Sequence, residues 1–361
     1  AFAGKQYQPS DKSNFGLFLD SAPDRWGRTL MRRREAINAR LQDRKPRTLT
    51  EADYLMGVYD RNRMGALRFK FSKDGEFMDN DRSLTTPPWT SIRELEHASL
   101  QIEREDYTDT PEHTRWIDML VAPGSSLGGA RPKANVVDEN GRLWIVKFPS
   151  AGDTKDSGAW EMVTAEMARS CGIEMSECRA QRFGSRHHSF MTERFDRTDR
   201  GRRIHFASAM TLLGYTDGAS RTEGASYLEL AEWIIANCDD TDRNLEQLWR
   251  RIVFNIAVSN CDDHLRNHGF LLTPQGWRLS PAYDMNPDEY GTGLKLNISE
   301  NDNSLEFDLA MSVTPYFGLE PARAESILAE VKHAVSGWRK LATQYGIPKS
   351  EQDAMERAFR Y

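Results

Sequence analysis

Three polar residues in the last third of the chain have a spacing that suits the transfer of a phosphoryl group. Asn267 follows Asp262 by five positions, and Asp284 comes seventeen positions later, beyond two short apolar segments. In kinase catalytic loops, an Asp accepts the proton of the attacking hydroxyl, an Asn five residues on binds a metal, and a second Asp beyond a hairpin holds Mg²⁺. Mg²⁺ prefers oxygen ligands and keeps several waters, so few protein ligands are needed. The spacing indicates a phosphotransfer site at these three residues.

A second interpretation is that these residues only shape turns. Asp and Asn side chains often bond to nearby backbone, and the tetrapeptide NCDD occurs twice, at residues 237–240 and 260–263. Only the second copy is followed by His264, Asn267 and a hairpin that ends in Tyr-Asp, whereas the first copy is placed to cap the next helix. The spacing alone leaves both interpretations open.

A glycine-rich stretch at residues 124–133 includes Arg131 and Lys133. Glycine allows the backbone to approach a ligand closely, and consecutive N–H groups in such a loop can hold an anion. A plain turn is the alternative, because a single glycine-rich loop is a weak signal. Residues 134–137 and 142–148 flank an Asn-Gly turn and predict a β-hairpin that would give the loop a rigid base.

Lys147 lies inside the apolar segment LWIVKFP. A buried ammonium group is costly unless it is paired, and kinases place the lysine that contacts ATP phosphates on a strand of this kind. Glu161 and Glu166, on the next predicted helix, are both possible partners, and the sequence does not choose between them. An edge-strand lysine that faces water is the alternative interpretation.

The other segments predict elements that position these residues. Residues 22–42 predict an amphipathic basic helix, which would suit an acidic partner or nucleic acid, or would simply be solvated. Residues 65–72 predict a strand, and CRAQRF and HSFMTERF predict a hairpin ahead of a polar, Arg-rich hinge. From residue 207 onward, the apolar spacing is mostly helical. We expect an α/β N-terminal part over residues 1–197 and a mostly helical C-terminal domain over residues 198–361.

The overall composition is that of an ordinary globular protein. Of the 361 residues, 39% are hydrophobic and 28% are charged, and the net charge of −6 provides no global basic field for nucleic acid. No run of about 18 apolar residues and no signal peptide is visible, so we expect a cytoplasmic protein without a membrane segment. The four cysteines lack zinc-site spacing, and we expect them to be reduced thiols.

Taken in order, these motifs resemble the HipA family of bacterial serine/threonine kinases, the toxin members of toxin–antitoxin pairs. Each motif is weak alone, but the ordered set extends from residue 14 to the C-terminus. The resemblance implies an α+β, protein-kinase-like, two-lobed fold with an α/β N-terminal part and an all-α C-terminal domain. The segments that carry it are FLDSAPDRWGR, GSSLGGARPK, IVKFP, TERFDR, NCDDHLRNHGFLL and LSPAYDMNP.

The resemblance also implies roles for particular residues. Asp262 would be the catalytic base, and Asn267 and Asp284 would bind Mg²⁺. Ser126 would be autophosphorylated, with Ser125 as the neighbouring alternative. The expected ATP-binding set contains Lys147 at the phosphates, the backbone of Glu193 and Phe195 at the adenine, and Gly128, Gly129, Arg131, Lys133 and His264.

Two departures from the family pattern bear on substrate and loop behaviour rather than on catalysis. The loop reads GGARPK where the best-studied form has Gln-Glu before the lysine, and Asp263 replaces a glycine beside the catalytic Asp. The chain begins only shortly before FLDSAPDRWGR, so we expect the N-terminal β subdomain of the family to be incomplete.

The function implied is that of an ATP- and Mg²⁺-dependent serine/threonine kinase that inhibits growth by phosphorylating a translation-related protein. The substrate would be an aminoacyl-tRNA synthetase or another translation factor. A small helix-turn-helix antitoxin would be the partner, and the chain would contact DNA only through it. Two alternatives stay open: a catalytically silent kinase-fold module that serves as the partner of the antitoxin, and a kinase that acts on a small molecule or lipid.

Overall fold

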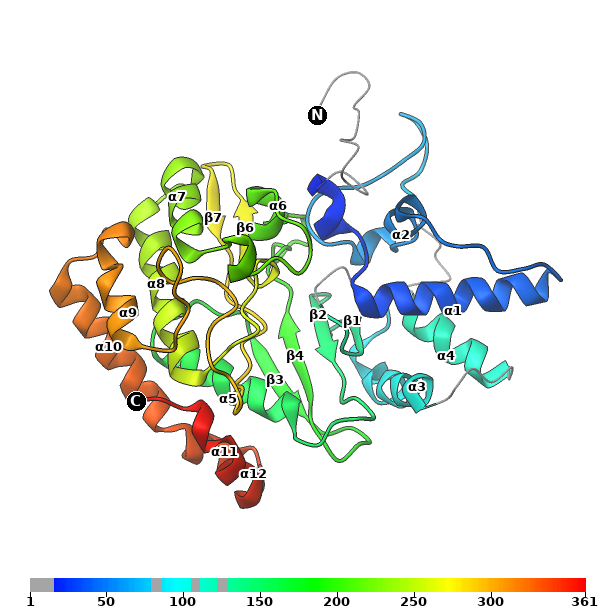
Figure 1. Ribbon diagram of the computed structural model, residues 1–361. Helices are drawn as coiled ribbons and strands as arrows, with labels where there is room; N and C mark the ends of the chain where they lie inside the picture. Colours follow the sequence, from blue (N-terminus) through cyan, green and yellow to red (C-terminus); the bar gives the residue numbers. More distant parts are fainter. Residues whose placement is uncertain (1–15, 79–85, 105–110, 122–128) are drawn as a thin grey trace.

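The structure is a computed structural model that describes residues 16–78, 86–104, 111–121 and 129–361. Two β-sheets and the surrounding helices form a mixed α+β architecture in two parts (Figure 1). One part contains the larger sheet and the N-terminal helices, and the other contains most of the C-terminal helices.

The N-terminal part is built on a four-stranded antiparallel sheet with the strand order β1-β2-β4-β3. Residue Lys133 of the first strand lies directly opposite Lys147 of the second. The hairpin predicted around the Asn-Gly turn is therefore confirmed, as is the hairpin predicted from CRAQRF and HSFMTERF. The strands are β1 (Lys133–Val137), β2 (Leu143–Lys147), β3 (Cys178–Gln181) and β4 (Ser189–Glu193).

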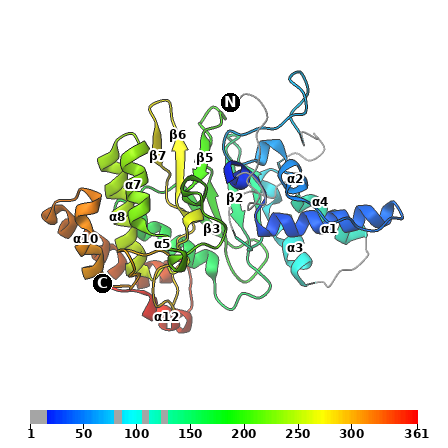
Figure 2. The same cartoon turned by 45° about the horizontal axis from the view of Figure 1, so that its top comes forward.

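The two faces of this sheet have different environments, because successive side chains of a strand point to opposite sides. On one face, Ala134, Val136, Trp144 and Val146 are buried against three helices. Figure 2 shows these helices on the side of the sheet away from the C-terminal part. The opposite face, which carries Lys147, turns toward the C-terminal part. The three helices are α1 (Arg25–Leu41), α3 (Ile92–Arg104) and α4 (Pro111–Val121).

The basic helix predicted at residues 22–42 is confirmed as α1, whose N-cap residue Asp24 accepts a hydrogen bond from the Gly27 N–H at 2.7 Å. A short 3-10 helix, η1 (Gly16–Ser21), precedes it, and α2 (Glu51–Met56) follows it. The strand predicted at residues 65–72 is wrong, since this segment forms bends and irregular chain. Leu67 and Phe69 are half-buried, but no strand in the described residues pairs with this segment, and Arg68 forms an ion pair with Asp60 at 2.6 Å.

The C-terminal part is mostly helical, and its helices share the largest apolar core with α5 (Ser157–Ser170), which also packs on β3 and β4. No helix in the described ranges is long and apolar enough to cross a membrane. The remaining helices are α6 (Ala209–Leu213), α7 (Tyr227–Asn237), α8 (Thr241–Val258), α9 (Phe307–Ser312), α10 (Pro321–Ser336), α11 (Trp338–Gln344) and α12 (Lys349–Met355).

A small antiparallel sheet, in the order β5-β6-β7, lies among these helices, so the C-terminal part is not all-helical. Its strands are β5 (His205–Ser208), β6 (Gly269–Leu272) and β7 (Trp277–Leu279). The hairpin of β6 and β7 is formed by the two apolar segments between Asn267 and Asp284. Phe270 and Leu271 are buried on opposite faces of β6, so this hairpin is fixed in the core. It therefore fixes the positions of the segments that precede and follow it in the sequence.

Candidate phosphotransfer site

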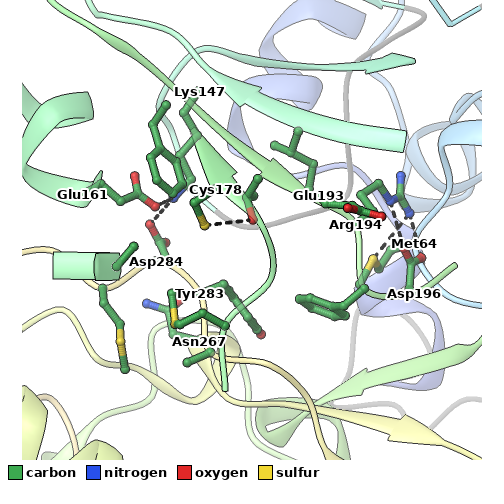
Figure 3. A pocket seen from close by; sticks show the side chains of 18 of the residues that line it. Met64, Lys147, Glu161, Cys178, Glu193, Arg194, Asp196, Asn267, Tyr283 and Asp284 are labelled. Carbon is green, nitrogen blue, oxygen red and sulfur yellow. Dashed lines mark hydrogen bonds and ion pairs between the residues drawn. The ribbon is translucent and has the colours of Figure 1, made fainter. Parts of the chain in front are cut away.

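A cleft between the four-stranded sheet and the segment after β7 brings together residues from distant parts of the sequence. Its lining includes Lys147 from β2, Glu193 and Phe195 from the end of β4, and Asn267 and Asp284 from either side of the small hairpin. Figure 3 shows Lys147 and Asp284 pointing toward each other across this cleft, with Asn267 nearby. Five of the residues predicted from sequence therefore meet in one place.

Lys147 forms the centre of an ion triad. Its Nζ lies 2.6 Å from Oε1 of Glu161 and 2.5 Å from Oδ1 of Asp284. Burial opposes the charged form, but the carboxylates of Asp284 and Glu161 outweigh it and raise the pKa of Lys147 above its ordinary value. The structure thus selects Glu161 as the helix partner of this lysine, whereas Glu166 accepts a hydrogen bond from the hydroxyl of Tyr345.

Asp284 is held in a restricted backbone conformation. Its φ of 60° lies in the left-handed region, which residues other than glycine seldom adopt and which is frequent at functional sites. Asn286 donates a hydrogen bond to Oδ1 at 3.2 Å. Burial opposes ionisation of Asp284, but the charge of Lys147 and its hydrogen bond prevail and lower the pKa to about 2. Asp284 therefore presents an oriented carboxylate at neutral pH.

The turn between α8 and β6 carries Asp262 and Asn267. The helix α8 ends at Val258, and the φ of 50° at its C-cap residue Ser259 turns the chain sharply. Asn267 is buried, and its Nδ2 donates to the carbonyl of Asp262 at 3.0 Å, so its side-chain oxygen is the atom left to bind a ligand. Asp262 is exposed and is not part of the cleft lining. Its carboxylate is therefore accessible to a large partner molecule.

The neighbouring Asp263, which departs from the family pattern, has a structural role. Its side chain is buried, accepts a hydrogen bond from Nδ2 of Asn255 at 2.6 Å and lies 2.7 Å from Nε2 of His268. Asn255 belongs to α8 and His268 precedes β6. Asp263 therefore ties the two ends of the turn together and fixes the path of the residues between them.

The donor set at the cleft fits Mg²⁺. The side-chain oxygens of Asn267 and Asp284 are hard ligands of the kind this cation prefers, and a site with two protein ligands leaves positions for phosphate oxygens and water. The described ranges contain no cluster of three or more His, Cys, Asp or Glu side chains that could hold a metal ion. A Mg²⁺ bound at these two residues would thus depend on a phosphate-bearing ligand for the rest of its coordination.

The end of β4 can offer its backbone to a ligand. Glu193 pairs with Trp144, so its side chain belongs to the face opposite Lys147, where it accepts a hydrogen bond from Arg142 at 2.8 Å. The Phe195 N–H has no hydrogen-bond acceptor within the described part of the chain. The ring of Phe195 packs 5.5 Å from that of Tyr283, measured between centroids. A donor and an apolar surface thus lie together at the cleft edge.

Other residues predicted to bind ATP lie outside the cleft lining. Lys133 Nζ lies 3.0 Å from Oδ2 of Asp24, and both side chains are almost inaccessible. Arg131 pairs with Asp153. The neighbouring Gly129 has a φ of 94°, and His264 is the residue that precedes the short helical turn Leu265–Asn267. Ser125, Ser126 and Gly128 lie outside the described residues.

Sequence reasoning missed the residues that fix the connection between the two sheets. Arg194 and Asp196 form a buried ion pair at 2.7 Å. Arg194 also donates to the carbonyl of Asn62 at 2.7 Å, and Asp196 accepts from the Gly65 N–H at 2.7 Å. Figure 3 shows this pair at the far end of the cleft from Lys147. The available signal was the TERFDR segment, in which charged residues directly follow a buried strand.

Asp20 was also missed. It lines the cleft, is 6% exposed and accepts a hydrogen bond from the Ser208 N–H at 2.7 Å. This contact holds η1 against the start of α6. The acidic residue inside the apolar segment FLDSAP was its only sequence signal.

The fold and this cleft define a kinase-like α+β protein. The chain belongs to the HipA-like C-terminal domain family, whose sequence profile matches residues 125–338.

Two curated relatives have kinase names. The "Serine/threonine-protein kinase toxin HipA" of Shewanella oneidensis is 26% identical over 192 residues, which cover 45% of this chain and 43% of that protein. A "Putative kinase" of Haemophilus influenzae is 25% identical over 179 residues, which cover 45% of this chain and 52% of that protein. The chain thus spans about half the length of the curated relatives it matches.

A solved structure supports the fold over nearly the whole chain. The Shewanella oneidensis HipA in a complex with HipB and operator DNA superposes with a TM-score of 0.67, covering 96% of this chain and 83% of that chain at 18% identity. At 18% identity, the similarity to that structure supports the fold alone.

Proposed function

We propose that this chain is an ATP- and Mg²⁺-dependent protein serine/threonine kinase. The observation that carries the proposal is the triad in which Lys147 joins Glu161 and Asp284 inside a cleft that Asn267 also lines. Kinases require the strand lysine, its helix glutamate and the metal-binding Asp to be in place together. Membership of the HipA-like family and the names of the curated relatives support the same activity.

In this proposal each group has a separate task. Glu161 orients Lys147 so that its ammonium can bind phosphate oxygens. The side-chain oxygens of Asn267 and Asp284 hold Mg²⁺, which neutralises charge on the phosphates when bound. The backbone of Glu193 and Phe195 holds the adenine, and the exposed Asp262 accepts the proton of a substrate hydroxyl.

We expect purified protein given labelled ATP and Mg²⁺ to transfer phosphate to serine or threonine, with its own loop as one acceptor. Intact-mass and peptide analysis should find the phosphate on Ser126, with Ser125 as the competing position. Chelation of Mg²⁺ should abolish the transfer, because in this proposal the cation held by Asn267 and Asp284 neutralises charge on the phosphates. Transfer that persists after chelation, or nucleotide bound outside the cleft in a soaked crystal, would contradict this assignment.

We further propose that the physiological substrate is a translation-related protein and that the partner is a small helix-turn-helix antitoxin. The complex of the structural neighbour with HipB and operator DNA supports such a partner.

The isolated chain is expected to bind duplex DNA poorly, because its net charge is −6 and phosphate contacts require a surplus of basic residues. Fluorescence anisotropy with a labelled operator duplex would measure this, with and without the antitoxin. Tight, salt-sensitive binding by the chain alone would contradict the proposal.

A further inference from the structure

The helix α5 sets the position of Glu161 and therefore the direction in which Lys147 points. Glu161 is near the N-terminus of this helix, and its Oε1 is 2.6 Å from Lys147 Nζ. One turn later, the Thr164 hydroxyl donates to the carbonyl of Met285 at 2.6 Å, next to Asp284. A rotation or shift of α5 would disturb the lysine and the metal-binding segment together.

A residue from the far C-terminus holds the beginning of this helix. Oε1 of Glu351, on α12, accepts a hydrogen bond from the backbone N–H of Asp156 at 2.9 Å and another from Nε1 of Trp160 at 2.8 Å. Asp156 is the N-cap residue of α5. One carboxylate oxygen therefore binds both the cap and the first turn of the helix, although it lies 195 and 191 positions away in the sequence.

Aromatic packing reinforces the same contact. The Trp160 ring is 1% exposed and lies 5.9 Å from the rings of both Trp338 and Phe359, which stack on each other at 4.4 Å. Trp160 and Glu161 are consecutive residues of one helix, so fixing the rotation of the first fixes that of the second. Figure 1 shows α11 and α12 next to α5.

The opposite side of α5 leaves no room for the helix to move away. Gly158 packs against the backbone of His188 so closely that a Cβ would lie 2.1 Å from its carbonyl oxygen. Oδ1 of Asp156 also accepts the His188 N–H at 2.9 Å. The helix is therefore wedged between the loop before β4 and the C-terminal helices.

We propose that Glu351 is a positioning residue for phosphoryl transfer, and that α12 holds α5 in the orientation that keeps Glu161 on Lys147. This inference rests on the proposed kinase function. Loss of the Glu351 contact releases the first turn of α5, separates Glu161 from Lys147 and leaves the lysine misdirected. In this proposal the C-terminal helices of the same chain hold α5 in place. Other kinases control the position of the helix that carries the corresponding glutamate.

The test compares Glu351→Ala with Glu351→Gln and with Asp353→Ala. The alanine variant removes the acceptor and is expected to lower kcat/KM for ATP about tenfold, while glutamine keeps an oxygen at the same place and should restore activity to within about threefold. Asp353 is on the same helix but forms an exposed pair with Arg339 at 3.0 Å, and its replacement should change little.

A double-mutant cycle separates positioning from general destabilisation. In a Glu161→Gln background, Glu351→Ala should have almost no further effect on kcat/KM, because the group that it positions is already gone. An equal loss in both backgrounds would overturn the proposal.

Amide exchange distinguishes failure of this inference from failure of the proposed function. Glu351→Ala should speed exchange in the first turn of α5 while the melting temperature of the chain stays nearly constant. If the wild-type chain transfers no phosphate, the proposed kinase function is wrong. If amide exchange in α5 is the same in Glu351→Ala as in the wild type, the positioning role of Glu351 is wrong.

Discussion

Replacing Asp262 by asparagine is expected to reduce phosphoryl transfer by about 10³-fold while leaving the affinity for Mg²⁺·ATP within about threefold of the wild type. The variant loses the proton acceptor and keeps nearly the same shape. Nucleotide affinity should persist because Asp262 is exposed and the cleft is lined by other residues. Single-turnover kinetics and isothermal titration with a non-hydrolysable ATP analogue would measure the two quantities separately.

The chain contains a matched control for this variant. Asp239 occupies the same position in the first NCDD copy, where its carboxylate accepts a hydrogen bond from the Thr273 hydroxyl at 3.3 Å. Asp239→Asn should therefore transfer phosphate at nearly the wild-type rate. Transfer by Asp262→Asn at a rate close to that of this control would remove Asp262 from the mechanism.

The second large effect is expected from Lys147→Met. This change leaves Glu161 and Asp284 facing each other without a cation, in a site where the Glu161 and Lys147 side chains are only 7% and 14% exposed. Phosphoryl transfer should fall by at least about 10²-fold, and the free energy of unfolding should fall by about 3 kcal/mol. Lys155→Met is the matched control, because Lys155 forms a more exposed pair with Glu289 and its loss should cost less than about 1 kcal/mol.

The pH dependence of unfolding between about pH 7 and pH 5 should change in this variant. In the wild type the pKa of Asp284 is lowered to about 2 from an ordinary 3.8, so its contribution to stability is complete above the ordinary value and is lost as the pH falls through about 2. Without Lys147, mutual repulsion raises the carboxyl pKa values. Lowering the pH from about 7 to about 5 should then stabilise the variant. Denaturant titrations across this range would give the free energy of unfolding of the wild type and of the variant at each pH. The same dependence on pH in both proteins would contradict the triad.

The elements that the sequence predicted well are those with local signals. The β1–β2 hairpin has an Asn-Gly turn between two apolar segments, and α1 has its N-cap at Asp24. The alternation at residues 65–72 misled the prediction, because a strand also needs a neighbouring strand to pair with, and that is not a local property. Here Arg68 pairs with Asp60 instead.

Within the site, the sequence located the chemistry but not its contacts. Glu161 and Glu166 lie on one helix, and only the packing of α5 on the sheet decides which of them meets Lys147. The Glu193 side chain points away from the Lys147 face of the sheet because of its register opposite Trp144. The structural role of Asp263 depends on contacts with α8 and with the residue before β6. These are tertiary properties, which residue spacing does not encode.

The buried pair of Arg194 and Asp196 has a consequence for the order in which the chain folds. Their partners Asn62 and Gly65 lie 132 and 131 positions earlier in the sequence. During synthesis these early residues emerge long before β4 exists, and joining them later closes a long loop at an entropic cost. The early segment can therefore dock only after residues 194 and 196 have been synthesised. Two distant stretches of chain therefore build the end of the cleft at Arg194 and Asp196, and this end is complete only after the early segment has docked.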